Sequence, residues 1–299
     1  MRKKNNIIIG DLIIDQNYLI KLTGKSAEFN SKKYKLMNKN FNLGGAGMVY
    51  IALKKLNPHI DFFTIASDKF KNIFFDLNQK KILFSSHFII EKKRFWEGNK
   101  LNFQINSVKV NIKEIKKFQI HFFKNIHNIK KNSKIILCDY RYGILSNRFT
   151  KKIIKILKKK NCIIYADQQS TSVDPDISKF KNIDYLILNE MEFDKIFKKY
   201  KIIGKNLLIK LIKLQKIFKI KYFVIKTGSK GCLMFKNNKI INSKPWKKKN
   251  SFINTVGAGD YFLASFVYNS EENMVERMKR SNNYAFSKII GKTKSLNID

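Results

Sequence analysis

The chain has 299 residues, 44% of them hydrophobic, so it is long enough to enclose a large core in one α/β unit. Lys and Arg outnumber Asp and Glu by 61 to 22, a formal net charge of +39, which would suit nucleic acid or an anionic membrane if the charge formed one patch. The basic residues instead occur in every segment, beside abundant Asn and Ile, which favours compositional drift with a general attraction for phosphorylated small molecules.

No apolar run reaches the length of a membrane span, and the N-terminal MRKKNNIIIGD lacks the apolar stretch of a signal peptide. Cys138, Cys162 and Cys232 lie far apart in apolar runs, which indicates buried, reduced thiols. These features predict a cytoplasmic protein with no membrane partner and no specific nucleic-acid partner.

Short apolar runs alternate with helix-period stretches in chain order. The predicted strands are Ile7–Ile9, Phe62–Ala66, Ile135–Cys138, Cys162–Ala166, Tyr185–Leu188 and Tyr222–Ile225. Helical periodicity falls between them, as around residues 153–157 and 207–215. This alternation predicts βαβ units and a three-layer α/β/α domain with a mostly parallel central sheet.

A polar residue directly or almost directly follows several of the predicted strands. These residues are Asp11, Asp139, Asp167, Asn189 and Thr227. Ligands of open α/β sheets bind outside the carboxyl ends of the strands, so these residues predict a site along that edge. Each of them alone is equally compatible with an ordinary turn or a helix cap.

Two segments, residues 12–42 and 85–110, interrupt the alternation. In the second, Leu101, Phe103 and Ile105 alternate with polar residues, and EGNK at 97–100 precedes them as a candidate hairpin turn. Together the segments predict a small separate sheet that could close over a site, although an ordinary surface hairpin fits the same pattern.

The stretch INTVGAGDYFLASF, residues 253–266, places glycines directly before an aspartate and an apolar helical run. Backbone N–H groups at such a helix start form an anion-binding site, and Asp260 would face the same point. There it could accept a proton from a hydroxyl that attacks phosphorus. A helix capped after a flexible turn is the alternative interpretation.

The chain resembles the ribokinase-like (PfkB) carbohydrate kinases over nearly its whole length. The motifs that carry the resemblance, in chain order, are GDLIID (10–15), LGGAG (43–47), DYRYG (139–143), NEME (189–192), KTGSKG (226–231) and NTVGAGD (254–260). Within the family, GDLIIDQNY, DYRYGIL and the basic KKRFWEGNKL look like the kinase half of bifunctional heptose-phosphate kinase/nucleotidyltransferase enzymes, whereas no nucleotidyltransferase motif of the H-x-G-H type is present.

The resemblance implies a single kinase domain over residues 1–299, with lid segments at about 12–42 and 85–110. It implies ATP as the phosphoryl donor, Mg²⁺ as the metal, a sugar or sugar phosphate as the acceptor, and a possible homodimer formed through the lid. The implied site residues are Asp260 as the base, Gly257, Ala258 and Gly259 as the anion hole, Asp11, Asp15, Gly44, Gly45, Lys93 and Arg94 for the acceptor, Asn189, Thr227, Gly228 and Gly231 for the nucleotide, and Glu192 for Mg²⁺ through water.

Several positions depart from the family pattern. Asn254 replaces the first Asp of the signature, which puts monovalent-cation activation in doubt, and Met48 stands where relatives often carry a substrate-binding Asn. Gln104 and Asn106 lie where the heptose branch tends to have Arg and Asp. D-glycero-D-manno-heptose 7-phosphate is the expected acceptor. The alternatives are another sugar or a nucleoside, or a degenerate, non-catalytic binding protein.

Overall fold

A large sheet forms the centre of the molecule. The computed structural model describes residues 5–74, 79–169, 175–244 and 255–291. Within them, nine strands lie in the order β13-β12-β11-β10-β9-β8-β1-β4-β5. Their bounds are β1 (Asn6–Gly10), β4 (Ile60–Ala66), β5 (Ile82–Phe84), β8 (Lys134–Asp139), β9 (Ile163–Gln168), β10 (Tyr185–Asn189), β11 (Tyr222–Lys226), β12 (Cys232–Lys236) and β13 (Lys239–Ser243).

All six predicted strands are present, with β9 beginning one residue later than predicted and ending two residues later. The seven neighbouring strands β11, β10, β9, β8, β1, β4 and β5 run parallel, and β12 and β13 are added antiparallel at one edge. Central strands such as β1 and β8 are buried along their whole length. This burial on both faces explains why their sequences read as continuous apolar runs rather than as alternating ones.

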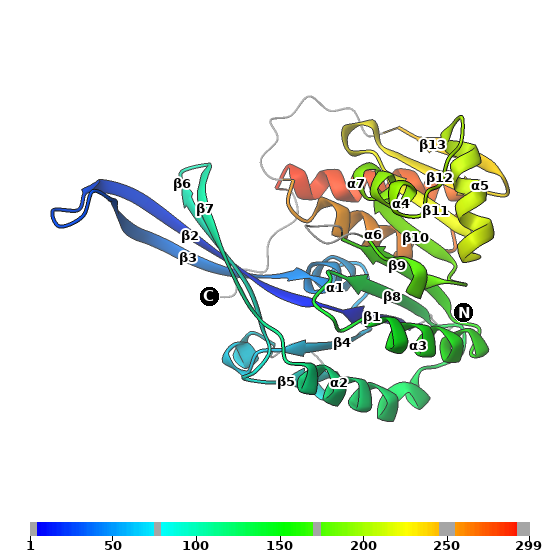
Figure 1. Ribbon diagram of the computed structural model, residues 1–299, viewed down its shortest axis with the longest axis horizontal. Helices are drawn as coiled ribbons and strands as arrows, with labels where there is room; N and C mark the ends of the chain where they lie inside the picture. Colours follow the sequence, from blue (N-terminus) through cyan, green and yellow to red (C-terminus); the bar gives the residue numbers. More distant parts are fainter. Residues whose placement is uncertain (1–4, 75–78, 170–174, 245–254, 292–299) are drawn as a thin grey trace.

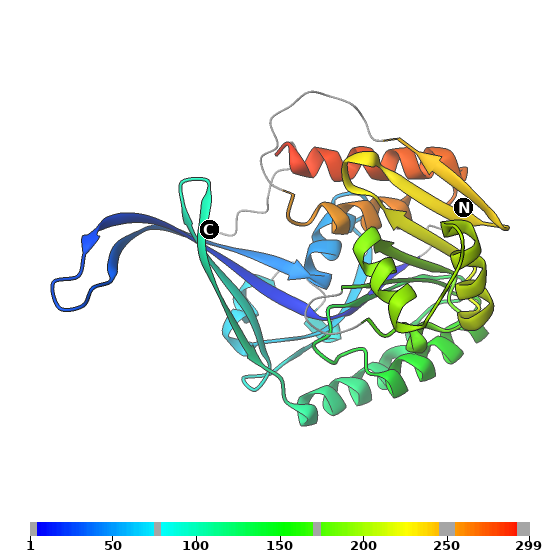
Figure 2. The same cartoon turned by 45° about the horizontal axis from the view of Figure 1, so that its top comes forward.

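Helices cover both faces of this sheet and complete three layers (Figure 2). On one face, α1 (Ala46–Lys54), α6 (Ala258–Tyr268) and α7 (Met274–Ile289) pack against one another. The other face carries α2 (Ile112–Asn125), α3 (Asn147–Lys159), α4 (Glu190–Lys199) and α5 (Leu207–Phe218). The predicted α/β/α architecture is confirmed.

A second sheet projects from the body as a long twisted ribbon (Figure 1). In the described residues it has four strands in the order β3-β2-β6-β7, with bounds β2 (Leu12–Lys25), β3 (Lys32–Gly45), β6 (Ile89–Glu97) and β7 (Lys100–Lys109). Gly98 and Asn99 form the two-residue turn between β6 and β7, with Gly98 at a φ of 56°, as the EGNK pattern predicted. The two segments that interrupted the βαβ alternation therefore form this small sheet.

The small sheet joins the body through two very short connections. Asp11 alone separates β1 from β2, and α1 begins directly after Gly45, the last residue of β3. The Ala46 N–H donates to the Asp11 carbonyl over 3.0 Å, which ties the two connections together. Gly45 has a φ of 60°, and a Cβ there would lie 2.6 Å from the Asp11 carbonyl oxygen, so only glycine fits.

Two further expectations concern the body of the molecule. The three cysteines are buried and make no disulfide, as their spacing predicted. Among the described residues, no helix is both long enough and apolar enough to cross a membrane.

Candidate functional site

Two cavities flank the start of α6 at the carboxyl ends of the strands. The strand-end cavity, about 290 Å³, is lined by Tyr140, Asp167, Gln169, Asn189, Glu192, Lys226, Gly228, Gly257, Gly259 and Asp260. The sheet-side cavity, about 100 Å³, lies between the small sheet and helices α1, α6 and α7, and is lined by Asp15, Asn17, Asn42, Met48, Ile51, Arg94, Trp96, Val256, Tyr261 and Lys288. Asp260 lines the first cavity, and its neighbours Val256 and Tyr261 line the second.

The start of α6 is built by glycine. Gly257 caps the helix with a φ of 82°, in the left-handed region, and has no side chain to cap the first turn. The positive end of the helix dipole lies at this turn, beside both cavities. Of the three residues expected to form an anion hole, Gly257 and Gly259 line the strand-end cavity, whereas the Ala258 N–H already donates to the Thr255 carbonyl over 3.2 Å. Asn254 lies outside the described residues.

Asp260 is partly buried and lies beside Tyr140, whose hydroxyl donates to the Asp260 Oδ1 over 2.5 Å. Burial raises the pKa of the Asp260 carboxyl to about 7, and Asp167 and Asp15 raise it further while Tyr140 and Lys226 oppose the shift. A carboxylate that exchanges its proton near neutral pH is suited to general-base work.

Asp11 is bonded to the backbone of the loop of residues 140–144 and lines neither of the two cavities. Its Oδ2 accepts the backbone N–H groups of Tyr140 and Tyr142 over 2.9 and 3.2 Å, and its Oδ1 accepts that of Ile144 over 3.2 Å. The side chain is completely buried, and burial raises its pKa. Because both oxygens are already bonded, the geometry does not support the expected direct contact of Asp11 with a substrate. Asp11 holds the loop that carries Tyr140.

Asp15 faces the sheet-side cavity, where the Arg94 Nη1 donates to its Oδ1 over 2.9 Å. The Arg94 Nε donates to the Gln104 Oε1 over 3.1 Å, so the guanidinium is held between the two residues. A Cβ at Gly44 would collide with the Asp15 carboxylate, which explains the glycine at the end of β3. Asp15, Arg94 and Gly44 therefore come together as the sequence predicted.

Lys93 does not join this group. Neighbouring residues of a strand point to opposite faces of the sheet, and the Lys93 Nζ lies 3.6 Å from the Glu91 Oε2 on the face away from Arg94. Lys92 lies on the Arg94 face, opposite Asp15 in the adjacent strand. Burial lowers the Lys92 pKa, while Asp15 and Asp260 act to raise it. The lysine on the same face as Arg94 is thus Lys92. Lys93, which the sequence resemblance implied for acceptor binding, points to the opposite face of the sheet.

The ends of β10 and β11 supply the far wall of the strand-end cavity. The Asn189 side chain accepts the Glu192 N–H, and the Glu192 Oε2 accepts the Asn189 N–H over 2.8 Å, so this pair caps α4. After β11, Thr227 starts a tight loop, and its N–H donates to the Gly231 carbonyl over 2.9 Å. Gly228, at a φ of 58°, brings the backbone of this loop to the cavity.

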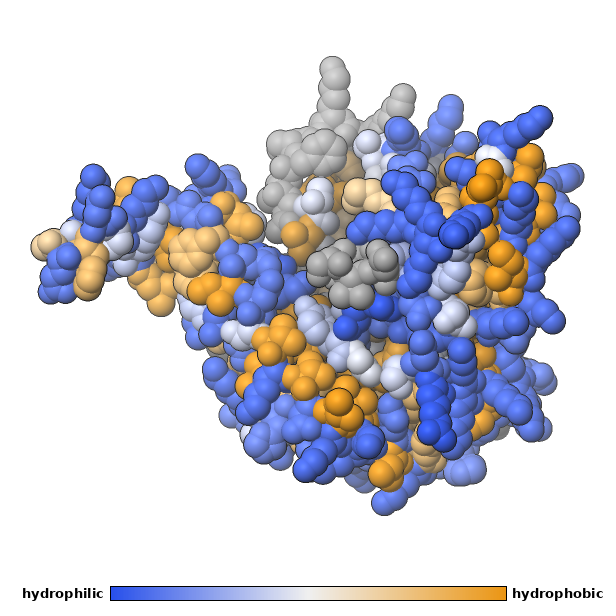
Figure 3. Space-filling view, viewed as in Figure 1, coloured by the Kyte–Doolittle hydropathy of each residue, from blue (hydrophilic) through white to orange (hydrophobic). Residues whose placement is uncertain are grey.

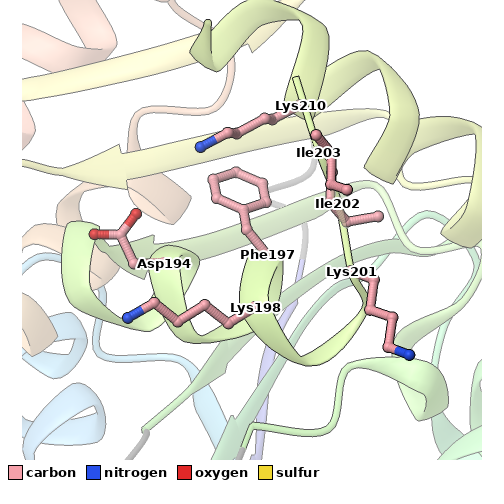
Figure 4. A pocket seen from close by; sticks show the side chains of 7 residues that line it. All are labelled: Asp194, Phe197, Lys198, Lys201, Ile202, Ile203 and Lys210. Carbon is pink, nitrogen blue, oxygen red and sulfur yellow. The ribbon is translucent and has the colours of Figure 1, made fainter. Parts of the chain in front are cut away.

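A third cavity lies away from these carboxylates, between α4 and the start of α5 (Figure 4). It measures about 440 Å³ and is lined by Asp194, Phe197, Lys198, Lys201, Ile202, Ile203 and Lys210. The Lys210 Nζ lies 5.4 Å from the centre of the Phe197 ring. Size alone would favour this cavity, but its one carboxylate, Asp194, is exposed, so it does not offer the same chemistry.

Sequence reasoning did not name three residues that the structure places at the candidate site: Tyr140, Lys92 and Lys226. Lys92 could have been found from strand alternation, because it is two residues from Arg94. Lys226 could have been noticed as the last residue of a strand beside the Thr227 loop. Tyr140 lies in the DYRYG motif, but its contact with Asp260 could not be foreseen, because the two residues are 120 positions apart in the chain.

The comparisons with known proteins agree with a phosphoryl-transfer site. Residues 3–286 match the family profile described as pfkB family carbohydrate kinase. The chain belongs to this family of carbohydrate kinases. Similar structures include phosphofructokinase-2 from Escherichia coli, with a TM-score of 0.74, 13% identity and coverage of 96% of this chain and 94% of that one. The ribokinase from Thermotoga maritima has a TM-score of 0.73, 18% identity and coverage of 98% and 94%. Both show the ribokinase-like fold.

Curated relatives are bifunctional. The bifunctional protein HldE from Aliarcobacter butzleri (strain RM4018) is 28% identical over 305 residues, which cover 97% of this chain and 62% of the relative. The bifunctional protein HldE from Campylobacter jejuni subsp. doylei is 25% identical over 304 residues, with coverage of 99% and 63%. The chain spans less than two thirds of the length of these relatives.

Proposed function

We propose that this carbohydrate kinase transfers the γ-phosphoryl group of ATP to a hydroxyl of a sugar phosphate, with D-glycero-D-manno-heptose 7-phosphate as the preferred acceptor. The observation that carries the proposal is the position of Asp260 at the start of α6: it lines the strand-end cavity, and Val256 and Tyr261 on either side of it line the sheet-side cavity. A donor bound in one cavity and an acceptor in the other would meet at this carboxylate. With ATP as the donor, a cytoplasmic location follows.

The sheet-side cavity suits the acceptor. Asp15, Asn17 and Asn42 supply oxygens and amides for sugar hydroxyls, and Arg94 and Lys288 supply positive charge for a phosphate. Arg94 contacts the Oδ1 of Asp15, so a hydroxyl that binds this oxygen would compete with Arg94 and leave its guanidinium available to the substrate phosphate. Lys92, beside Arg94 on the same face, adds a second cation.

The strand-end cavity suits the nucleotide. Gly228 would allow close approach of ATP to the backbone of the Thr227–Gly231 loop, and the first-turn N–H groups of α6 would bind the moving phosphoryl group. Asp260 would take the proton from the acceptor hydroxyl as its oxygen attacks phosphorus.

Magnesium would belong near Glu192 and Asn189. Their oxygens are the ligand type that Mg²⁺ accepts, but both side chains already cap α4, and no metal-ligand cluster of three or more His, Cys, Asp or Glu occurs among the described residues. The fit is therefore to an ion that keeps its water shell and contacts the protein through it. When bound, it would neutralise charge on the phosphates of ATP.

The small sheet would act as a lid, because Asp15, Arg94 and Trp96 reach the sheet-side cavity from it. The direct test is ADP release from Mg-ATP with a panel of acceptors that pairs the heptose phosphate with the unphosphorylated heptose, fructose 6-phosphate and ribose. A charge-assisted contact predicts a kcat/KM about 10–100-fold higher for the phosphorylated heptose than for the free sugar. Equal kcat/KM values for the heptose phosphate and the free heptose would exclude a phosphate-binding role for Arg94. A lack of turnover with every acceptor of the panel would contradict the proposal.

The role of Tyr140 predicts a change in pH dependence. For the wild type, kcat/KM should rise with pH through about 7 as Asp260 loses its proton. The Tyr140 hydroxyl lowers the pKa of Asp260, so Tyr140→Phe should move this rise to higher pH. Tyr200→Phe, which removes a hydroxyl bonded to the distant Asp176, is the matched control and should leave the profile in place. An unmoved profile in Tyr140→Phe would show that the two groups are not coupled.

The small sheet also offers a surface for a second copy of the chain, as the sequence resemblance implied. Phe103 and Ile105 are about half exposed and pair with Phe95 and Lys93, on the face away from Arg94. Apolar side chains gather along the projecting ribbon (Figure 3). Exposed apolar patches of this kind mark interaction sites.

Light scattering on a sizing column tests this dimer. The wild type should have twice the chain mass, and Phe103→Lys should have the mass of one chain. Ile120→Lys, which changes an exposed apolar residue of α2, is the control and should remain dimeric. A monomeric wild type at all concentrations would refute the lid-mediated dimer.

A further inference from the structure

Lys226 lies directly over the start of α6. It is the last residue of β11, and its Nζ is 3.1 Å from the Asp167 Oδ2 at the end of β9. The same Nζ lies 3.3 Å from the point where a Cβ of Gly259 would be. The ammonium group therefore sits beside the first turn of α6, inside the strand-end cavity.

The acidic groups around Lys226 keep it charged. Burial alone would lower its pKa, but Asp167, Glu192 and Asp260 outweigh that effect and raise it. Two sources of positive potential, the ammonium group and the first-turn N–H groups of α6, thus converge on one wall of the cavity. In the free protein, Asp167 balances the ammonium charge.

We propose that Lys226 is a catalytic cation that binds the γ-phosphoryl group of ATP during transfer. The inference rests on the proposed kinase function and names a further residue of its reaction. The acceptor oxygen forms a bond to the γ-phosphorus while the bond from that phosphorus to the bridging oxygen of ADP breaks, and the electron pair leaves with ADP. The hydroxyl proton goes to Asp260. The ammonium of Lys226 turns from Asp167 to a non-bridging phosphoryl oxygen and keeps its own protons.

The position of Lys226 separates this role from general attraction by a basic chain. Most lysines of the molecule lie on the surface, where water and salt screen their charge. Lys226 is largely buried, pairs with Asp167, and lines the same cavity as Asp260 beside the helix start. A donor that is already in place and shielded from water stabilises a developing charge far better than a surface lysine does.

The test compares Lys226→Met with Lys216→Met, which removes the same charge from the exposed face of α5. Loss of one such donor predicts a kcat lower by roughly 10²–10³-fold in Lys226→Met, with the KM for the acceptor unchanged. A contact to the γ-phosphate also predicts that the preference for ATP over ADP, measured by calorimetry, falls about 10-fold or more while ADP affinity is kept. Lys216→Met should match the wild type in both measurements. A kcat within threefold of the wild type, or an unchanged preference for ATP, would overturn the proposal.

A double variant, Lys226→Met with Asp167→Asn, separates catalysis from structure and also covers a single variant that fails to fold. It removes both members of the ion pair, so no buried charge is left unpaired. If Lys226 only supports the fold, the double variant should regain activity; if Lys226 is catalytic, kcat should stay low. The binding measurement needs no turnover. The two proposals can therefore fail separately. If Lys226→Met loses the preference for ATP but the wild type turns over no acceptor, the proposed function is refuted and the contact of Lys226 with the γ-phosphate stands.

Discussion

Asp260→Asn should lower kcat by about 10²–10⁴-fold, because it removes the only group positioned at the start of α6 that can accept the acceptor proton near neutral pH, among the residues that the structure describes. Asn has the same shape and can still accept the Tyr140 hydroxyl, so the cavities should keep their form. ATP binding, measured by calorimetry, should change little. A variant that keeps more than a tenth of the activity would remove Asp260 from the role of base.

The same variant should be more stable than the wild type above neutral pH. The pKa of Asp260 is about 7 in the folded protein and 3.8 in the reference state, so the folded protein binds the extra proton between these values. The contribution of this group to the free energy of unfolding therefore falls as pH rises from about 4 through 7, and the destabilisation reaches its full size above 7. In thermal unfolding, Asp260→Asn should have a higher midpoint temperature than the wild type at pH 8, and the difference should be smaller at pH 5.

Arg277→Ala should lower the free energy of unfolding by about 3–5 kcal/mol, a large part of the stability of an ordinary domain. The side chain is completely buried in α7. Its Nε donates to the Phe266 carbonyl over 2.5 Å, and its other nitrogens donate to the hydroxyls of Tyr185 and Tyr165 over 3.2 and 3.1 Å. The guanidinium carbon lies 3.7 Å from the centre of the Phe266 ring.

The expected loss has two physical sources. Removal of the side chain leaves a cavity and three polar groups without their partner, and each unsatisfied buried group costs about 1–3 kcal/mol. Arg280→Ala is the matched control on the same helix: its side chain is exposed and pairs at the surface with Glu276 and Glu272, so the change should be within about 1 kcal/mol. Urea unfolding of both variants gives the comparison. A cost for Arg277→Ala no larger than that for Arg280→Ala would mean that the buried guanidinium contributes no net stability.

The architecture was predictable because its signals are local. The runs at Ile7–Ile9 and Ile135–Cys138 are apolar throughout, and only strands buried on both faces read in this way. The antiparallel strands β12 and β13 were missed. β13 is the edge strand of the large sheet, where exposed residues such as Lys239 and Asn242 dilute the apolar pattern.

The site was predictable only in part, because its details depend on tertiary contacts. A glycine-flanked aspartate at a helix start identified Asp260, but its bond to Tyr140 joins distant parts of the chain. Asp11 has the residue type and the position of a substrate ligand, yet three backbone N–H groups of the 140–144 loop occupy it. Arg277 would be placed on the surface by its charge. Its burial depends on two tyrosines from neighbouring strands, which no helical periodicity reveals.

Asp11 also has a mechanical consequence, because every polar group of this residue is tied to a different element. Its N–H donates to the Cys138 carbonyl of β8, its carbonyl accepts the Ala46 N–H of α1, and its carboxylate holds the loop that carries Tyr140. The small sheet departs from this same residue. Asp11 is therefore a pivot with two arms, one ending at the small sheet and the other at the hydroxyl that contacts Asp260. If the proposed function is correct, a tilt of the small sheet toward an acceptor would also shift the loop that positions Tyr140 beside Asp260.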